Sequence, residues 1–179
     1  MKNRFLLLLI FLFSLNGWAQ KSQLQIAKNS IGKLQVSITN KADSKKQLTI
    51  IGEGIKALES AQKDKKTKNW SETWAIKAYL SSFIALIDNN TANADKYYGL
   101  AIEALNQVNK LDKFKDNSSL TKAAIYNINA KKQEEGNRAF NKNDFVTAFD
   151  LLKQVSDYLP TDTTLAINVG LCAQNIKDY

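Results

Sequence analysis

The sequence contains no histidine and a single cysteine, and these two shortages exclude several kinds of active site. Histidine is the side chain most often used as a general base and is the commonest metal ligand. With Cys172 as the only thiol, the chain can form neither an internal disulfide nor a cysteine metal cluster. We therefore expect no zinc site, no redox dithiol and no triad built on histidine. The sequence suggests no catalytic residue, no metal ligand and no cofactor, and we interpret the chain as not being an enzyme.

Proline and glycine are also scarce, with 1 proline and 7 glycines among 179 residues. Proline and glycine are common in turns, and all-β proteins contain many turns. Hydrophobic residues make up 44% of the chain, which is sufficient for a core. The composition therefore favours an all-α fold of long helices.

Acidic residues are fewer than basic ones, and the formal net charge is +8. A basic balance is compatible with nucleic acid, an anionic polymer or a membrane surface. The lysines are scattered and are not interleaved with aromatic residues in one segment, so a solvated surface is the simpler interpretation and nucleic acid is not expected. The run KDKKTK at 63–68 is interpreted as a solvated connector between helices. A module that binds an anionic polymer stays open as an alternative.

The first nineteen residues have the three parts of an export signal. Lys2 and Arg4 precede an apolar run at 5–15, and Gly17 and Ala19 are the small residues of a cleavage site after Ala19. The run is shorter than the ~20 apolar residues of a membrane-spanning helix. We expect the signal to be removed and the protein to be exported, to the periplasm or into association with the cell envelope, with no transmembrane segment after cleavage. An uncleaved membrane anchor is the alternative.

Beyond residue 20, apolar residues recur at alternating spacings of three and four, which places them on one face of a helix. Seven such sets follow one another: Leu24–Ile38, Leu48–Gln62, Ile76–Ile87, Ala94–Val108, Leu120–Ile128, Phe145–Leu159 and Leu165–Ala173. The segments between them are rich in Asp, Asn, Ser and Thr, which favour turns and helix N-termini. Because these connections are short, consecutive helices are expected to run antiparallel as hairpins.

Two short segments near the C-terminus are alike: NKNDF at 141–145 and NIKDY at 175–179, which lie 34 residues apart. This is the period of the tetratricopeptide repeat (TPR), a helix–turn–helix unit. With Pro160 near the end of a unit, one repeat covers 129–162 and the next begins at Thr163. On these residues the chain resembles the tetratricopeptide repeat family, and its whole layout is similar to exported tetratricopeptide proteins of Bacteroidota.

The resemblance implies antiparallel helix hairpins stacked as a right-handed α-solenoid. It also implies that Gly136 and Ala148 let the two helices of a repeat approach closely, and that Asp144 caps the second helix. The match departs from the family pattern at Lys132, Glu135 and Ala139. The residues that it assigns to packing are Trp74, Ala78, Ala101, Leu105, Gly136, Phe145, Ala148, Leu152, Pro160 and Gly170.

The domain organisation that follows has five parts: a signal peptide at 1–19, a divergent N-terminal hairpin or cap at 20–66, a divergent TPR-like hairpin with long helices at 67–115, a repeat with an extended first helix at 116–162, and the first half of a further repeat at 163–179. Repeat arrays normally end in a polar capping helix. We therefore expect the chain to be the N-terminal fragment of a longer protein, and a natural end at Tyr179 is the alternative.

In this family the first helix of each repeat lines a concave groove, so the resemblance implies a partner-binding surface. Its residues are Gln133, Asn137, Phe140, Asn141, Ile167, Asn168, Leu171 and Asn175. The expected function is a non-catalytic protein–protein interaction scaffold of the cell envelope that binds a protein or peptide segment. The alternative is the N-terminal adaptor region of a larger envelope enzyme or transport component. Asn137 and Asn168 match positions at which family members clamp a peptide carboxylate, but Gln133 replaces the lysine of that clamp.

Two further sets of side chains have a functional and a structural interpretation. The aromatic residues Trp70, Trp74, Tyr97 and Tyr98 could stack on sugars, although residues at helical spacing belong more often to a core. Cys172 is interpreted as a small buried residue, because a catalytic cysteine would need a histidine partner.

Overall fold

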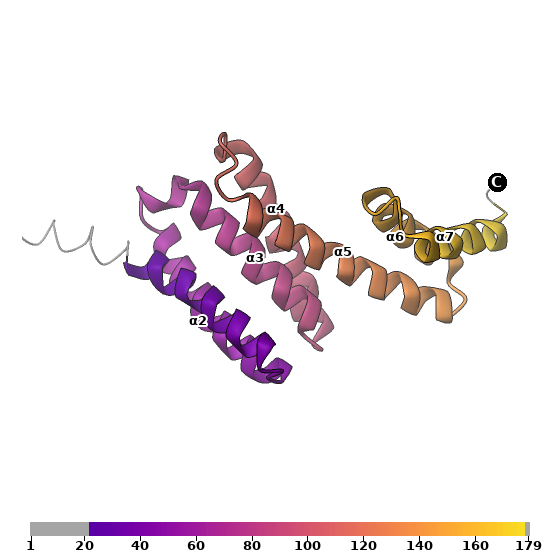
Figure 1. Cartoon of the computed structure of the whole chain (residues 1–179), viewed down its shortest axis with the longest axis horizontal. Coiled ribbons are helices and arrows are strands. Elements are labelled where there is room, and N and C mark those ends of the chain that lie inside the picture. Colours follow the sequence, from indigo (N-terminus) through magenta and orange to yellow (C-terminus); the bar gives the residue numbers. More distant parts are fainter. Residues whose placement is uncertain (1–21, 178–179) are drawn as a thin grey trace, which may run out of the picture. The chain divides into compact units, whose positions relative to one another are not determined.

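The computed structural model describes residues 22–177, and every regular element in that range is helical, which confirms the all-α prediction (Figure 1). The elements are a helix at 22–39, α2 (Ser44–Gln62), the 3₁₀ turn η1 (Thr67–Asn69), α3 (Ser71–Ile87), α4 (Thr91–Leu111), α5 (Ser118–Asn141), α6 (Phe145–Tyr158) and α7 (Thr163–Ile176). The predicted export signal, its cleavage site after Ala19 and the C-terminal pair at 178–179 lie outside the described residues.

Polar residues in the predicted breaks begin the helices by capping their first backbone amides. The carboxylates of Asp43 and Asp162 accept from the third residue of α2 and α7, at 2.8 and 2.9 Å. The side chain of Asn90 does the same for α4 at 3.0 Å. Asp144 accepts from the amide of Thr147 at 3.2 Å, which confirms its predicted role as the cap of α6.

The chain divides into two compact units, and the boundary falls inside α5, after Ala124. Unit 1 comprises the described residues 22–124, and unit 2 comprises 125–177. Each unit has a hydrophobic cluster of its own.

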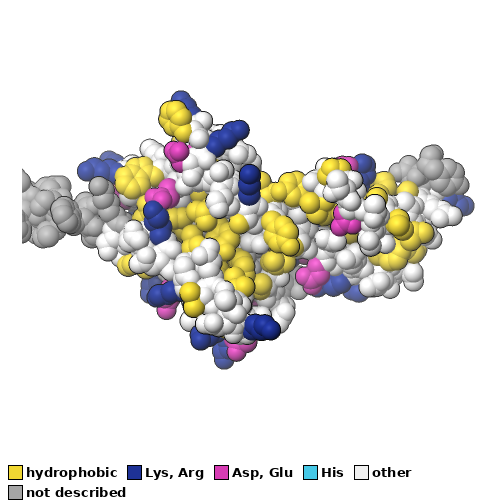
Figure 2. Space-filling model, in the orientation of Figure 1, with side chains coloured by type: hydrophobic (Ala, Val, Ile, Leu, Met, Phe, Trp, Pro, Cys, Tyr) yellow, Lys and Arg dark blue, Asp and Glu magenta, His cyan; other side chains and the backbone are white. Residues whose placement is uncertain are grey.

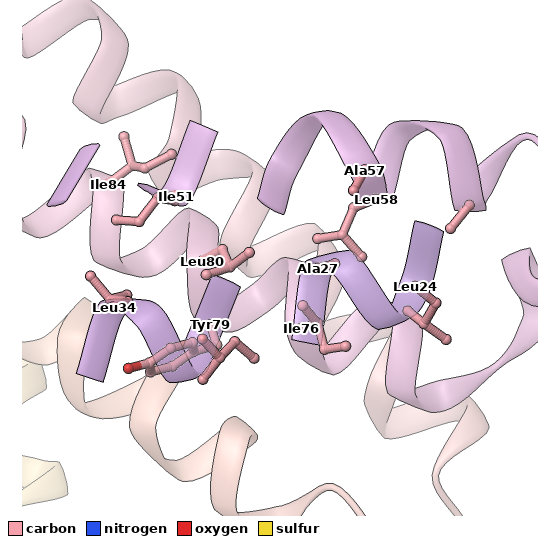
Figure 3. Close-up of a cluster of buried hydrophobic side chains, with 12 residues drawn as sticks. Leu24, Ala27, Leu34, Ile51, Ala57, Leu58, Ile76, Tyr79, Leu80 and Ile84 are labelled. Carbon is pink, nitrogen blue, oxygen red and sulfur yellow. The ribbon is translucent and has the colours of Figure 1, made fainter. Parts of the chain in front are cut away.

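In unit 1, the helix at 22–39 packs with α2 and α3 around one apolar cluster (Figure 3). The buried members are Leu24, Ala27, Ile31, Leu34, Ile51, Ala57, Leu58, Ala61, Ile76, Tyr79, Leu80 and Ile84. Gly54 marks the closest approach, because a Cβ built there would lie 2.7 Å from Cδ1 of Leu80 and 2.9 Å from Cβ of Ser30. Only a glycine leaves room for the three helices to meet at this point.

α3 is buried around most of its circumference, and not on the single face that the apolar spacing predicts. The predicted residues Ile76 and Leu80 are fully buried, but so are the small residues Ala75, Ala78 and Ser81. α3 lies between α2 and α4 and packs against both, so its small residues face a second neighbour. Alanine and serine contribute little to a hydrophobic pattern. For this reason the spacing of the large apolar residues indicates only one of the buried faces of α3.

The first predicted stripe is correct at four positions and wrong at its last. Leu24, Ala27, Ile31 and Leu34 are buried, whereas Ile38 is 40% exposed and Ser37 is buried in its place. The hydroxyl of Ser37 donates to the carbonyl of Leu34 at 2.7 Å, so this polar side chain is satisfied inside the helix and needs no water.

The connector at 63–68 is more ordered than a solvated charge run requires. Thr67 is buried; its hydroxyl donates to the carbonyl of Ala61, and its own carbonyl accepts from the hydroxyl of Thr73 at 2.8 Å. The indole nitrogen of Trp74 donates to the carbonyl of Lys68 at 2.7 Å. These bonds fix the path from α2 into α3, while the lysine side chains remain at the surface.

In unit 2, the C-terminal part of α5 packs with α6 and α7. The buried cluster is Ala139, Ala148, Leu152, Val155, Leu165 and Cys172. A Cβ at Gly136 would lie 2.7 Å from both Cγ and Cδ2 of Leu152, so α5 and α6 cross closely here. The rings of Phe140 and Phe145 meet edge to face beside the crossing, with centroids 5.5 Å apart.

Two glycines of α2 provide a matched test of the crossing in unit 1. Gly54→Ala should lower the free energy of unfolding by about 1–3 kcal/mol, because the new methyl group overlaps Leu80 and Ser30. Gly52→Ala should raise it by about 0.5–1 kcal/mol, since Gly52 is exposed with nothing within 4 Å and alanine is the better helix former. Urea unfolding followed by tryptophan fluorescence measures both changes; stabilisation by Gly54→Ala would contradict the close packing.

Gly136 and Gly170 give the corresponding pair in unit 2. Cys172 is fully buried, so a thiol reagent labels it only when its surroundings open. Gly136→Ala should destabilise unit 2 by about 1–3 kcal/mol and accelerate labelling about tenfold or more. Gly170→Ala should leave the labelling rate unchanged or lower it, because a Cβ there meets nothing within 4 Å. Equal labelling rates for the two variants would show that Gly136 does not support the helix crossing.

Candidate functional site

The groove residues predicted on α5 differ in how far solvent reaches them. Asn137 and Asn141 are exposed, and Gln133 is half-buried. Phe140 is also half-buried and packs against the hydrophobic cluster of unit 2 beside Phe145. Phe140 therefore supports the fold at this place, and its part in binding a partner stays a prediction.

The groove residues predicted on α7 include two large apolar side chains that face solvent. Ile167 is 62% exposed and Leu171 is 41% exposed. Gly170 lies between them in the helix, and the space above its Cα is open. We call Ile167, Gly170 and Leu171 the α7 surface. Hydrophobic side chains are visible on the surface over α6 and α7 in Figure 2.

The opposite face of α7 holds this helix in place. Leu165 and Cys172 are buried in the cluster shared with α6, and Asp162 caps the first turn. Burial raises the pKa of the Cys172 thiol, so the thiolate that a nucleophile requires is disfavoured. The α7 surface is thus presented by a helix that is anchored on its other side.

The polar side chains of α7 itself are amides and hydroxyls. The helix itself, TTLAINVGLCAQNI, contains no charged residue. Asn168 is half-buried, and the side chain of Asn175 donates to the carbonyl of Leu171 at 2.8 Å. The carboxylate clamp suggested by Asn137 and Asn168 stays a prediction.

A second feature, in unit 1, is a pocket of about 120 Å³ between α2, α3 and α4. We call it the α2–α4 pocket. Its lining residues are Ile55, Leu58, Glu59, Gln62, Lys77, Ser81, Lys96, Tyr97 and Leu100. They follow helical spacing on each of the three helices, so one face of each helix turns towards the pocket.

Two polar atoms of the pocket lining are buried without a hydrogen-bond partner among the described residues. They are the hydroxyl oxygen of Ser81 and the side-chain nitrogen of Gln62. The great majority of buried polar groups in proteins are paired, and leaving one unpaired costs about 1–3 kcal/mol. Two unpaired atoms in one pocket therefore require an explanation.

The remaining polar groups of the pocket carry charge or titrate. The ammonium of Lys77 lies 4.0 Å from a carboxylate oxygen of Glu103 and 5.0 Å from the ring centroid of Trp74. The ammonium of Lys96 lies 5.5 Å from the ring centroid of Tyr97. Burial raises the pKa of the Tyr97 phenol, and the charges of nearby Glu59 and Asp88 raise it further, so Tyr97 is a neutral hydroxyl at pH 7.

Sequence reasoning does not identify this pocket. One signal was available: Gln62 occupies the last position of an otherwise apolar stripe, and a polar residue there points towards the helix neighbours. Ser81 gives no signal, because serine is common on every face of a helix. The pocket forms only when three helices from separate segments meet, and a local sequence pattern does not predict such contacts.

The other packing residues predicted from the sequence differ in burial. Ala78, Ala101, Ala148 and Leu152 are fully buried, and Leu105 is 9% exposed. Trp74 and Phe145 are half-buried, while Pro160 and Gly170 are exposed. Of the aromatic residues considered for sugar stacking, Trp70 is 38% exposed and Tyr97 packs against the unit 1 cluster.

Within residues 22–177, no helix combines the length and the apolar composition that crossing a lipid bilayer demands. The chain matches no family model, no curated protein and no solved structure in the comparisons.

Proposed function

We propose that this protein is a non-catalytic scaffold that binds a segment of another protein on the α7 surface. The resemblance of 129–179 to tetratricopeptide repeats supports this proposal. We include in the proposal that the helix hairpins stack as a solenoid. The close crossing at Gly136 and the cap at Asp144 are what such a repeat needs. In this proposal α7 is the first helix of a repeat and presents its free face to the partner.

One observation carries the proposal: Ile167 and Leu171 are exposed, at 62% and 41%, on a helix that is capped and buried on its other side. These two large aliphatic side chains lie one turn apart, and the space above Gly170 between them is empty. Another helix could therefore pack closely against this surface. Burying two such side chains is worth roughly 1.5–3 kcal/mol each.

The chemistry of the α7 surface indicates what kind of segment it receives. Because α7 has no charged residue, neither a polyanion nor an acidic peptide gains an ion pair there. On the face shown in Figure 2, the lysine and arginine side chains are spread over unit 1 and do not gather in one patch. An amphipathic helix with aliphatic anchors and amide or hydroxyl neighbours matches the apolar and amide groups of α7.

The proposal places the protein outside the cytoplasm, in the periplasm or at the cell envelope. This part rests on the export signal in the first nineteen residues and on the resemblance to exported repeat proteins.

Photocrosslinking in the cells that make the protein tests the proposal, because Val146 provides a matched control. Val146 is 60% exposed on α6 and Ile167 is 62% exposed on α7. A photoreactive benzoylphenylalanine at position 167 should crosslink to a defined protein, whereas the same group at position 146 should not. The crosslinked segment is then synthesised as a peptide, and its binding to the purified chain is measured by fluorescence anisotropy.

Ile167→Asp should weaken binding of that peptide by about tenfold or more, and Val146→Asp by less than about twofold. Both variants should keep the far-ultraviolet circular dichroism of the unaltered chain, because both side chains already face solvent. Equal crosslinking from the two positions, or a peptide that binds Ile167→Asp normally, would contradict the proposal.

A further inference from the structure

Two buried polar groups of the α2–α4 pocket have no hydrogen-bond partner among the described residues. They are the hydroxyl of Ser81, which can donate or accept, and the side-chain nitrogen of Gln62, which can only donate. The ammonium groups of Lys77 and Lys96 add donors that cannot accept. The carboxylate of Glu59 is the one anionic side chain of the lining. An acceptor on a ligand would therefore pair with both buried groups, which the carboxylate of Glu59 does not do.

The position of these groups divides the pocket into a floor and a rim. Ser81 is fully buried and Leu58 is 1% exposed, so they form the floor. Glu59 and Lys96 are exposed and stand at the rim. The side chain of Lys77 is 15% exposed, which is low for a lysine, and its ammonium lies 4.0 Å from a carboxylate oxygen of Glu103. A cation close to unpaired donors favours an anion.

The apolar part of the lining restricts the choice of anion. Ile55, Leu58 and Leu100 come from two helices and contribute aliphatic surface. A fully hydrated ion such as phosphate gains nothing from these side chains, whereas an aliphatic chain does. The volume of about 120 Å³ is somewhat below the ~150 Å³ of a cavity that holds benzene, so the pocket encloses about five or six non-hydrogen atoms of a ligand. The remaining atoms of a slightly longer chain lie at the rim.

We propose that the α2–α4 pocket is a binding site for a short-chain aliphatic carboxylate. One carboxylate oxygen accepts from the hydroxyl of Ser81 and the other accepts from the side-chain nitrogen of Gln62. Lys77 and Lys96 balance the charge, and the aliphatic chain contacts Leu58 and its apolar neighbours. This site lies in unit 1 and is independent of the α7 surface, so either proposal can fail without the other.

A titration of the purified, isotope-labelled chain with sodium hexanoate tests this site by nuclear magnetic resonance. Amide signals of residues around Leu58, Ser81 and Leu100 should shift, with a dissociation constant on the order of 1 mM, as expected for so small a ligand. Hexan-1-ol has the same chain without the charge, and it should bind at least about tenfold more weakly.

Two neighbouring serines of α3 provide matched variants with opposite expected effects on hexanoate binding and on melting temperature. The hydroxyl of Ser81 has no partner in the described part of the chain, whereas the hydroxyl of Ser82 donates to the carbonyl of Tyr79 at 2.8 Å. Ser81→Ala should weaken hexanoate binding about tenfold and leave the melting temperature unchanged or higher, because it removes an unpaired buried group. Ser82→Ala should leave hexanoate binding unchanged and lower the melting temperature. Gln62→Leu should weaken binding as Ser81→Ala does.

Three results would overturn the assignment of this site. The first is the absence of amide shifts with hexanoate, which would mean that water alone satisfies Ser81 and Gln62. The second is equal affinity for hexanoate and hexan-1-ol, which would make the pocket an apolar site without anion recognition. The third is normal hexanoate binding by a folded Ser81→Ala chain.

Discussion

The close approach of helix backbones at small side chains is the constraint on which the rest of this structure depends. At Gly54, three helices of unit 1 meet at a point where a single methyl group would overlap Leu80 and Ser30. At Gly136, α5 and α6 of unit 2 meet in the same manner over Leu152. Glycine in a helix interior is unfavourable by about 1 kcal/mol relative to alanine, so packing at these crossings has to compensate for that cost.

Both candidate sites follow from this packing. In unit 2, the buried face of α7 leaves Ile167 and Leu171 on the other side, where a partner helix can reach them. In unit 1, α3 is enclosed so fully that polar residues at the edge of its packing face become buried, and Ser81 is one of them. The half-covered helix α7 thus leaves apolar side chains at the surface, whereas α3, which is covered on both sides, buries a polar side chain beside a pocket.

The local structure could be read from the sequence to a large extent, because apolar spacing and capping residues act over short distances. The breaks between helices and the cap at Asp144 are where the residues predict them. The wrong assignment of Ile38 and the unforeseen burial around α3 share one cause, since serine and alanine give no pattern that reveals a second packing face. Gly54 and the α2–α4 pocket depend on contacts between distant segments, which single-helix periodicity cannot encode. The binding roles of the groove residues stay predictions.

A double-mutant cycle at the α5–α6 crossing tests the packing constraint most directly. Leu152→Ala removes both atoms that a methyl group at Gly136 would overlap, so it should relieve the strain of Gly136→Ala. The unfolding free energies of the unaltered chain, the two single variants and the double variant are compared in urea. We predict that the double variant is more stable than the sum of the single effects implies, by about 1–2 kcal/mol. Additive effects within about 0.3 kcal/mol would contradict the claim that the helix crossing depends on the absence of a side chain at Gly136.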